Sequence, residues 1–121
     1  MKVAVTSGGE KLDSEVDLRF GRAKYIFLVD TESGEHEIID NKQNLNAAQG
    51  AGIQTGQNVI ELNVEAVISG NVGPKAFRVL ETAGVKVFLA ASGITVAEAV
   101  ERLKAGDLDQ VDQANVEGHW A

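Results

Sequence analysis

Residues 66–89 read AVISGNVGPKAFRVLETAGVKVFL, and this stretch decides the fold class. The apolar run 66–68 has the length and composition of a buried strand. A glycine-rich turn at 70–73 leads to Pro74, a residue favoured in the first turn of a helix. Residues 85–89 form a second run that favours a strand. Because strand–helix–strand crossovers are right-handed, we predict a β-α-β unit with two parallel strands.

The helix expected between these strands has apolar residues at the i, i+3, i+4 and i+7 positions, which are Ala76, Val79, Leu80 and Ala83. Gly84 follows, where helices commonly end in a left-handed residue. A similar pattern follows at 95–106, because Thr95 and Glu98 have the spacing of a capping box and Gly106 can end the helix. Both segments are therefore predicted to be helices that cover the sheet.

Upstream of this unit, the sequence favours strands at 2–6, 25–29 and 36–40, and a helix at 51–62. The third strand is short and polar, as expected of an edge strand that forms a hairpin with the second. The apolar residues of the helix at 51–62 that we expect in the core are Ile53, Val59 and Ile60.

These elements combine into an α/β fold with three α/β/α layers. The expected sheet is mixed and five-stranded, in the order 3-2-1-4-5, with the second strand antiparallel to the first. We interpret residues 1–106 as one domain and residues 107–121 as an acidic C-terminal tail.

Composition excludes several kinds of function. The chain has 121 residues, 44% of them hydrophobic, and no cysteine, so disulfides and thiolate metal ligands are ruled out. Its net charge of −7 argues against nucleic-acid or anionic-membrane partners, which need a basic surface. No signal-like segment and no 18-residue apolar run occur, and we expect a cytoplasmic protein.

Binding is expected at one edge of the sheet, where the loops 7–24, 41–51, 70–74 and 90–95 should all emerge. Ligands of open α/β sheets bind outside the carboxyl ends of the parallel strands, where helix N-termini also point. Eight of the thirteen glycines and six of the eleven basic residues lie in or beside these loops. The candidate binding residues are Ser7, Gly8, Gly9, Arg19, Phe20, Gly21, Arg22, Gly50, Gly52, Gly70, Asn71, Gly73 and Lys75.

Arg19 and Arg22 are the strongest of these candidates, because they bracket a glycine and each presents a planar set of donors to an anion. The alternative is that Arg22 pairs with a nearby carboxylate. The turn at 70–75 can hold an anion at a helix N-terminus, but it lacks the spacing of a nucleotide-binding P-loop. His119 is a candidate metal ligand, and a solvated terminal histidine is the alternative.

An enzymatic function has little support. The first strand carries no acidic residue that could hold a catalytic metal at its end. The two histidines lie away from the glycine-rich edge, so no serine–histidine–acid arrangement is indicated.

The ordered motifs of residues 1–106 resemble the nitrogenase iron–molybdenum cofactor carrier family. They are the strand 1–5, Phe20-Gly21-Arg22-Ala23, Gly50-Ala51-Gly52, Gly70-Asn71-Val72-Gly73-Pro74, Gly84-Val85-Lys86-Val87 and Thr95-Val96-Ala97-Glu98-Ala99. The resemblance implies a ribonuclease-H-like fold and non-enzymatic binding of a preformed metal–sulfur cluster of iron and molybdenum. The ending Glu117-Gly118-His119-Trp120 is similar to the orange-protein branch, which holds a molybdenum–copper sulfide cluster.

One position departs from that family, whose members often carry histidine immediately before Phe-Gly-Arg. Here the residue is Arg19, a fixed cation rather than an imidazole ligand. The resemblance therefore implies an anionic cluster held non-covalently by backbone N–H groups, Arg19, Arg22 and Lys75, and exchanged with a donor or recipient protein. The alternative is a regulatory or interaction module that binds a nucleotide, a small anion or a partner protein at the same edge.

Overall fold

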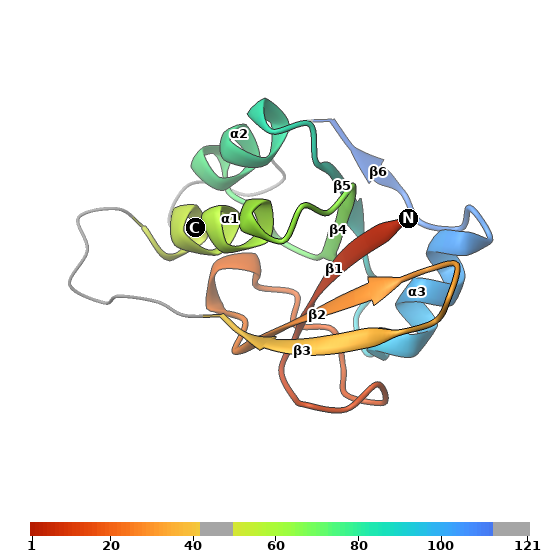
Figure 1. Ribbon diagram of the computed structural model, residues 1–121. Helices are drawn as coiled ribbons and strands as arrows, with labels where there is room; N and C mark the ends of the chain where they lie inside the picture. Colours follow the sequence, from red (N-terminus) through yellow and green to blue (C-terminus); the bar gives the residue numbers. More distant parts are fainter. Residues whose placement is uncertain (42–49, 113–121) are drawn as a thin grey trace.

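A computed structural model describes residues 1–41 and 50–112 of the chain (Figure 1). Its centre is a mixed six-stranded sheet in the order β3-β2-β1-β4-β5-β6. The strands are β1 (Lys2–Ser7), β2 (Tyr25–Asp30), β3 (His36–Asp40), β4 (Ala66–Ser69), β5 (Lys86–Leu89) and β6 (Gln110–Val111). The helices are α1 (Ala51–Glu61), α2 (Pro74–Thr82), α3 (Val96–Lys104) and a single 3₁₀ turn, η1 (Phe20–Arg22).

Strand pairing confirms the predicted order of the first five strands. β1, β4 and β5 run parallel, whereas β2 is antiparallel to both β1 and β3. The prediction of five strands in all was wrong, because β6 adds an antiparallel edge in which Val111 pairs with Val87. This strand lies within the segment expected to be an acidic tail. β6 has only two residues and lies between Asp109 and Asp112, so it is too short to show the alternating pattern by which a strand is predicted from sequence.

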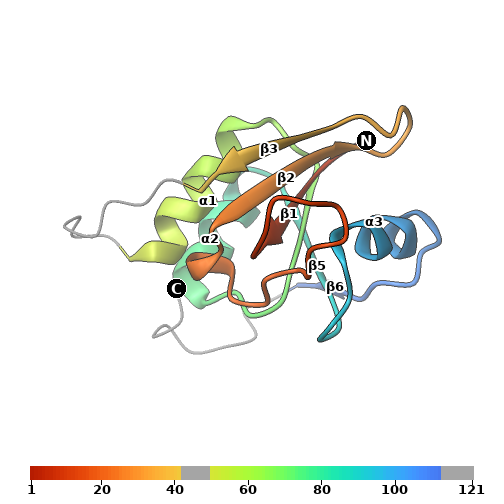
Figure 2. The same cartoon turned by 90° about the horizontal axis from the view of Figure 1, so that it is seen from below.

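The two faces of the sheet are covered by different helices. α1 and α2 lie side by side on one face and α3 lies on the other (Figures 1 and 2). Side chains alternate along β1, so Val3 and Val5 pack into the core beneath α3 while Ala4 faces the core beneath α1 and α2. The α/β/α prediction is confirmed.

The local helix signals also agree with the structure. α2 begins at Pro74 and is followed at Gly84 by a left-handed residue with φ of 77°. The Thr95 hydroxyl accepts a hydrogen bond from the Glu98 N–H, and the Glu98 carboxylate accepts one from the Thr95 N–H, which completes the capping box of α3.

Four positions expected on the core face of a helix are not buried. Val59 is fully buried, but Ile53, Ile60 and Val79 are only partly buried, and Ala83 is exposed. The reason is that α1 and α2 pack on each other as well as on the sheet. A methyl group at Gly56 would lie 3.3 Å from Val79, so these apolar residues line the outer seam between the two helices.

The turn between β2 and β3 gives a pH-dependent prediction. The Asp30 carboxylate accepts hydrogen bonds from the Glu32 N–H at 2.9 Å and the Ser33 N–H at 3.3 Å, and these bonds lower the pKa of Asp30. A lowered folded-state pKa stabilises the fold above the unfolded value of about 3.9, and that contribution is lost as the pH falls through the folded value. We expect carboxyl-carbon NMR to report an Asp30 pKa below about 3.9. Titration at or above that value would contradict these bonds.

Candidate functional site

The carboxyl edge of the central strands is crossed by the chain between β1 and η1. The buried hydroxyl of Thr6 donates to the Asp17 carbonyl at 2.8 Å and hydrogen-bonds the Ser69 hydroxyl at 2.7 Å. The Asp17 N–H returns a bond to the Thr6 carbonyl at 2.9 Å. These hydrogen bonds join the ends of β1 and β4 to the crossing segment and fix its position at the carboxyl edge.

Beyond Asp17, the crossing segment runs beside the turn between β4 and α2. The Asn71 N–H donates to the Leu18 carbonyl, and the Phe20 N–H donates to the Asn71 carbonyl at 3.2 Å. A side chain at Gly70 would place its Cβ only 2.6 Å from the Leu18 Cβ. Glycine at 70 therefore lets two backbone segments touch, and it brings Arg19 next to the start of α2.

The arginine-bearing turn η1 is anchored at its middle and exposed at its ends. Phe20 is fully buried in the core beneath α1 and α2. Gly21 is pressed against α1, since a Cβ there would lie 2.7 Å from the backbone nitrogen of Gly52. Arg19 and Arg22 flank this anchor and are exposed to solvent. The sequence thus places two guanidinium groups on a rigidly held turn beside the first turn of α1.

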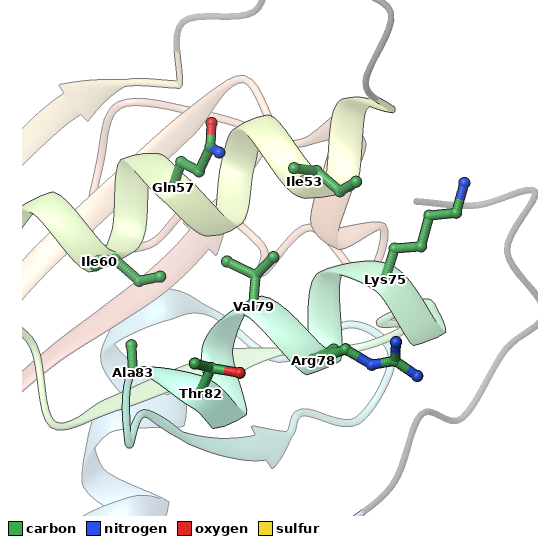
Figure 3. Close-up of a pocket in the computed structure, with 8 residues that line it drawn as sticks. All are labelled: Ile53, Gln57, Ile60, Lys75, Arg78, Val79, Thr82 and Ala83. Atoms are coloured by element: carbon green, nitrogen blue, oxygen red, sulfur yellow. The ribbon is translucent and has the colours of Figure 1, made fainter.

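The N-termini of α1 and α2 complete the edge. Their N-caps are Gly50 and Gly73, neither helix has a side-chain cap, and neither carries an acidic residue in its first turn. No N-cap side chain and no first-turn carboxylate of the described chain therefore offsets the positive ends of the two helix dipoles. Lys75 extends from the first turn of α2, at the same end of the helix pair as Ile53 of α1 (Figure 3).

The charges at this edge are unequally paired. The Arg19 Nε lies 3.4 Å from Asp17 Oδ1, whereas no ion pair involves Arg22 or Lys75 among residues 1–41 and 50–112. The Glu10 carboxylate accepts a hydrogen bond from the Tyr25 hydroxyl at 2.7 Å, and this bond raises the pKa of Tyr25. Two exposed cations thus remain available to an anion.

The structure gathers most of the predicted site residues but not all. Those on the α1–α2 side are Arg19, Phe20, Gly21, Arg22, Gly50, Gly52, Gly70, Asn71, Gly73 and Lys75. Five members of this group are buried and contribute through the backbone rather than through an exposed side chain, namely Phe20, Gly21, Gly52, Gly70 and Gly73. Ser7, Gly8 and Gly9 lead instead into the chain that packs along α3, where the Val96 N–H donates to the Ser14 carbonyl. His119 lies outside the described residues.

The sequence did not reveal a buried amide that ties this edge together. Asn41 donates to the Ala23 carbonyl at 2.8 Å and to the Thr55 hydroxyl at 2.9 Å, and its own carbonyl oxygen accepts from Asn58 at 2.8 Å. These bonds fix the exit of η1 against α1. An asparagine after an edge strand looks like an ordinary turn residue, so no sequence signal marks it.

Protein ligands for a bare metal ion are not apparent in this part of the chain. Within 1–41 and 50–112, no three histidine, cysteine, aspartate or glutamate side chains come together in a way that could hold a metal ion. The donors at the edge are instead guanidinium, ammonium and backbone N–H groups, which bind anions.

None of the described helices is long and apolar enough to cross a bilayer.

Comparison with known proteins decides the family. The family model described as dinitrogenase iron-molybdenum cofactor matches residues 1–106, which include every described element of the edge. The chain belongs to the dinitrogenase iron-molybdenum cofactor family. This confirms the resemblance drawn from the ordered motifs of the sequence.

Solved structures of similar proteins share the fold across almost the whole chain. The apo form of the orange protein from Desulfovibrio gigas superposes with a TM-score of 0.89 at 37% identity, covering 95% of this chain and 96% of that one. A candidate NifB protein from Thermotoga gives 0.80 at 38% identity, covering 97% and 98%. An uncharacterized protein of Methanocaldococcus jannaschii is 29% identical over 115 residues, 93% of this chain and 92% of its own length.

Proposed function

We propose that this member of the dinitrogenase iron-molybdenum cofactor family binds and carries a preformed anionic metal–sulfur cluster, without catalysing a reaction. The observation that carries the proposal is the meeting of two uncapped helix N-termini with the exposed arginines of η1. The family description and the similarity to the orange protein support a molybdenum-containing cluster as the cargo, and iron or copper as its second metal is part of the proposal.

The proposed mode of binding is electrostatic. A cluster that brings its own sulfides needs no thiolate from the protein, and this chain has no cysteine to offer. Backbone N–H groups of the first turns of α1 and α2 would meet the sulfides, while Arg19, Arg22 and Lys75 would balance the negative charge. Charge-assisted hydrogen bonds of this kind are about twice as strong as neutral ones. Because no bond to the metal has to break, the cluster can pass to a recipient protein.

This mode predicts that binding weakens with ionic strength. Thiomolybdate, a preformed molybdenum–sulfide anion, serves as the probe, and its dissociation constant is measured anaerobically by visible absorbance. Exposed charge contacts are screened beyond about 8 Å at 0.15 M salt, and we expect a roughly three- to tenfold loss of affinity when the salt is raised to 0.5 M. Affinity that does not change with salt would favour direct ligation of the metal instead.

The competing proposal is that the protein binds a nucleotide or small anion instead of a cluster. Anaerobic purification followed by absorbance and metal analysis distinguishes the two. Carriage of a cluster predicts a coloured protein after anaerobic purification, with metal found by elemental analysis. If the protein is colourless, binds a nucleotide saturably and does not bind thiomolybdate, the cluster-carrier proposal is wrong and a regulatory module is favoured.

A further inference from the structure

A groove beside the proposed cluster site, with which it shares Lys75, runs along the seam between α1 and α2. Ile53 and Ile60 of α1 and Val79 of α2 line it, with a volume of about 620 Å³. Figure 3 shows Val79 pointing from α2 toward α1. This volume falls in the range of about 300–1,000 Å³ in which clefts hold ligands, so an indole ring and its neighbours can enter.

The groove selects for negative charge as well as for apolar groups. Lys75 and Arg78 line it, and no acidic residue of the described chain does. Both side chains lie toward the N-terminal half of α2 (Figure 3). On a protein with a net charge of −7, a cationic end on an apolar groove indicates an occupant with apolar and acidic residues.

The chain itself contains such a segment. Residues 105–121 have four acidic residues, Asp107, Asp109, Asp112 and Glu117, and no lysine or arginine. Val116 and Trp120 are the bulky apolar residues after β6, and Glu117 lies between them in sequence. Residues 113–121 lie outside the part of the chain that the structure describes.

The described chain stops close enough to the groove for this segment to reach it. β6 runs toward the start of β5, and Asp112 lines a hollow with Glu81 and Gly84 at the C-terminal end of α2. Nine extended residues span up to about 30 Å, whereas the nine residues of α2 are about 14 Å long. A short tether of this kind gives an effective concentration in the millimolar range, so weak contacts suffice.

We propose that residues 113–121 bind back into the groove between α1 and α2, with Trp120 against Val79 and the isoleucines and Glu117 near Lys75 and Arg78. This docking covers apolar surface that the fold otherwise leaves exposed to water. The docking shares Lys75 with the proposed cluster site, whereas Arg78 is a groove cation that the proposed cluster site does not use.

Trp120 is the only tryptophan, so its fluorescence reports on the proposal directly. We expect acrylamide to quench Trp120 in the full chain roughly threefold more slowly than in a synthetic peptide of residues 112–121, with emission shifted to the blue. Val79→Glu and Arg78→Glu should both move quenching toward the peptide value. Ala97→Glu places the same carboxylate on α3, across the sheet, and should leave quenching unchanged.

The outcomes separate the possible occupants. Arg78 is exposed, so Arg78→Glu should keep its fold, and it decides the question if Val79→Glu fails to fold by circular dichroism. Quenching of the full chain at the peptide rate would overturn the proposal. Protection of Trp120 from acrylamide that increases with protein concentration would also overturn it, because the groove would then bind a second copy of the chain. Protection that survives both substitutions would place Trp120 elsewhere.

Discussion

Replacing Arg22 by alanine is expected to weaken thiomolybdate binding about ten- to a hundredfold, the largest effect of any side-chain truncation at the edge. Arg22 follows the anchored residues Phe20 and Gly21, is exposed, and makes no ion pair with any described residue. Losing one charge-assisted contact costs about 1.5–3 kcal/mol of binding free energy. Arg22→Lys should recover only part of the affinity, because lysine keeps the charge but not the planar pair of donors.

Folding should be nearly unaffected by that change. A surface arginine without a partner usually alters the free energy of unfolding by less than about 0.5 kcal/mol. Arg102→Ala is the matched control, since Arg102 is an exposed arginine on α3 across the sheet and should not affect binding. Titrations and thermal melts of the four proteins decide the matter. If Arg22→Ala binds thiomolybdate as tightly as the wild type, the basic edge does not bind the anion as proposed. If the variant melts at a much lower temperature, Arg22 has a structural role instead.

Replacing Gly70 by alanine is expected to give the largest loss of stability from one added methyl group. The new Cβ would lie 2.6 Å from both the Cβ and the carbonyl oxygen of Leu18, and the residue is buried. The crossing segment would have to lift away from the turn that starts α2. Overpacking of this kind typically costs about 1–3 kcal/mol of the free energy of unfolding, which urea denaturation measures.

Gly8→Ala provides the matched control at the same edge of the sheet. No atom lies within 4 Å of the Cβ that alanine would add there. The substitution should be neutral, or stabilising by up to about 1 kcal/mol through the lower entropy of the unfolded chain. Equal stability of Gly70→Ala and Gly8→Ala would show that the segment yields easily and that the contact with Leu18 does not constrain the edge.

The fold was largely predictable because its main signals act over a few residues. The spacing of Ala76 and Leu80, the glycine at 84 and the Thr95–Glu98 capping box each specify a local conformation. Chain order and the handedness of crossovers then leave few ways to arrange the strands. The two-residue strand β6 escaped prediction, because its pairing with β5 is decided by a neighbour more than twenty residues away.

The candidate site was predictable only in part. The sequence by itself predicted a carboxyl edge rich in glycine with Arg19 and Arg22 beside it, and its family motifs place it among dinitrogenase iron-molybdenum cofactor proteins. Only the tertiary structure decided that Gly21 and Gly70 contact the backbone of another segment, that Asn41 is buried, and that Val79 lines the groove between α1 and α2. The physical reason is that these roles depend on contacts between segments distant in the chain, and periodicity or composition describes only neighbours in sequence.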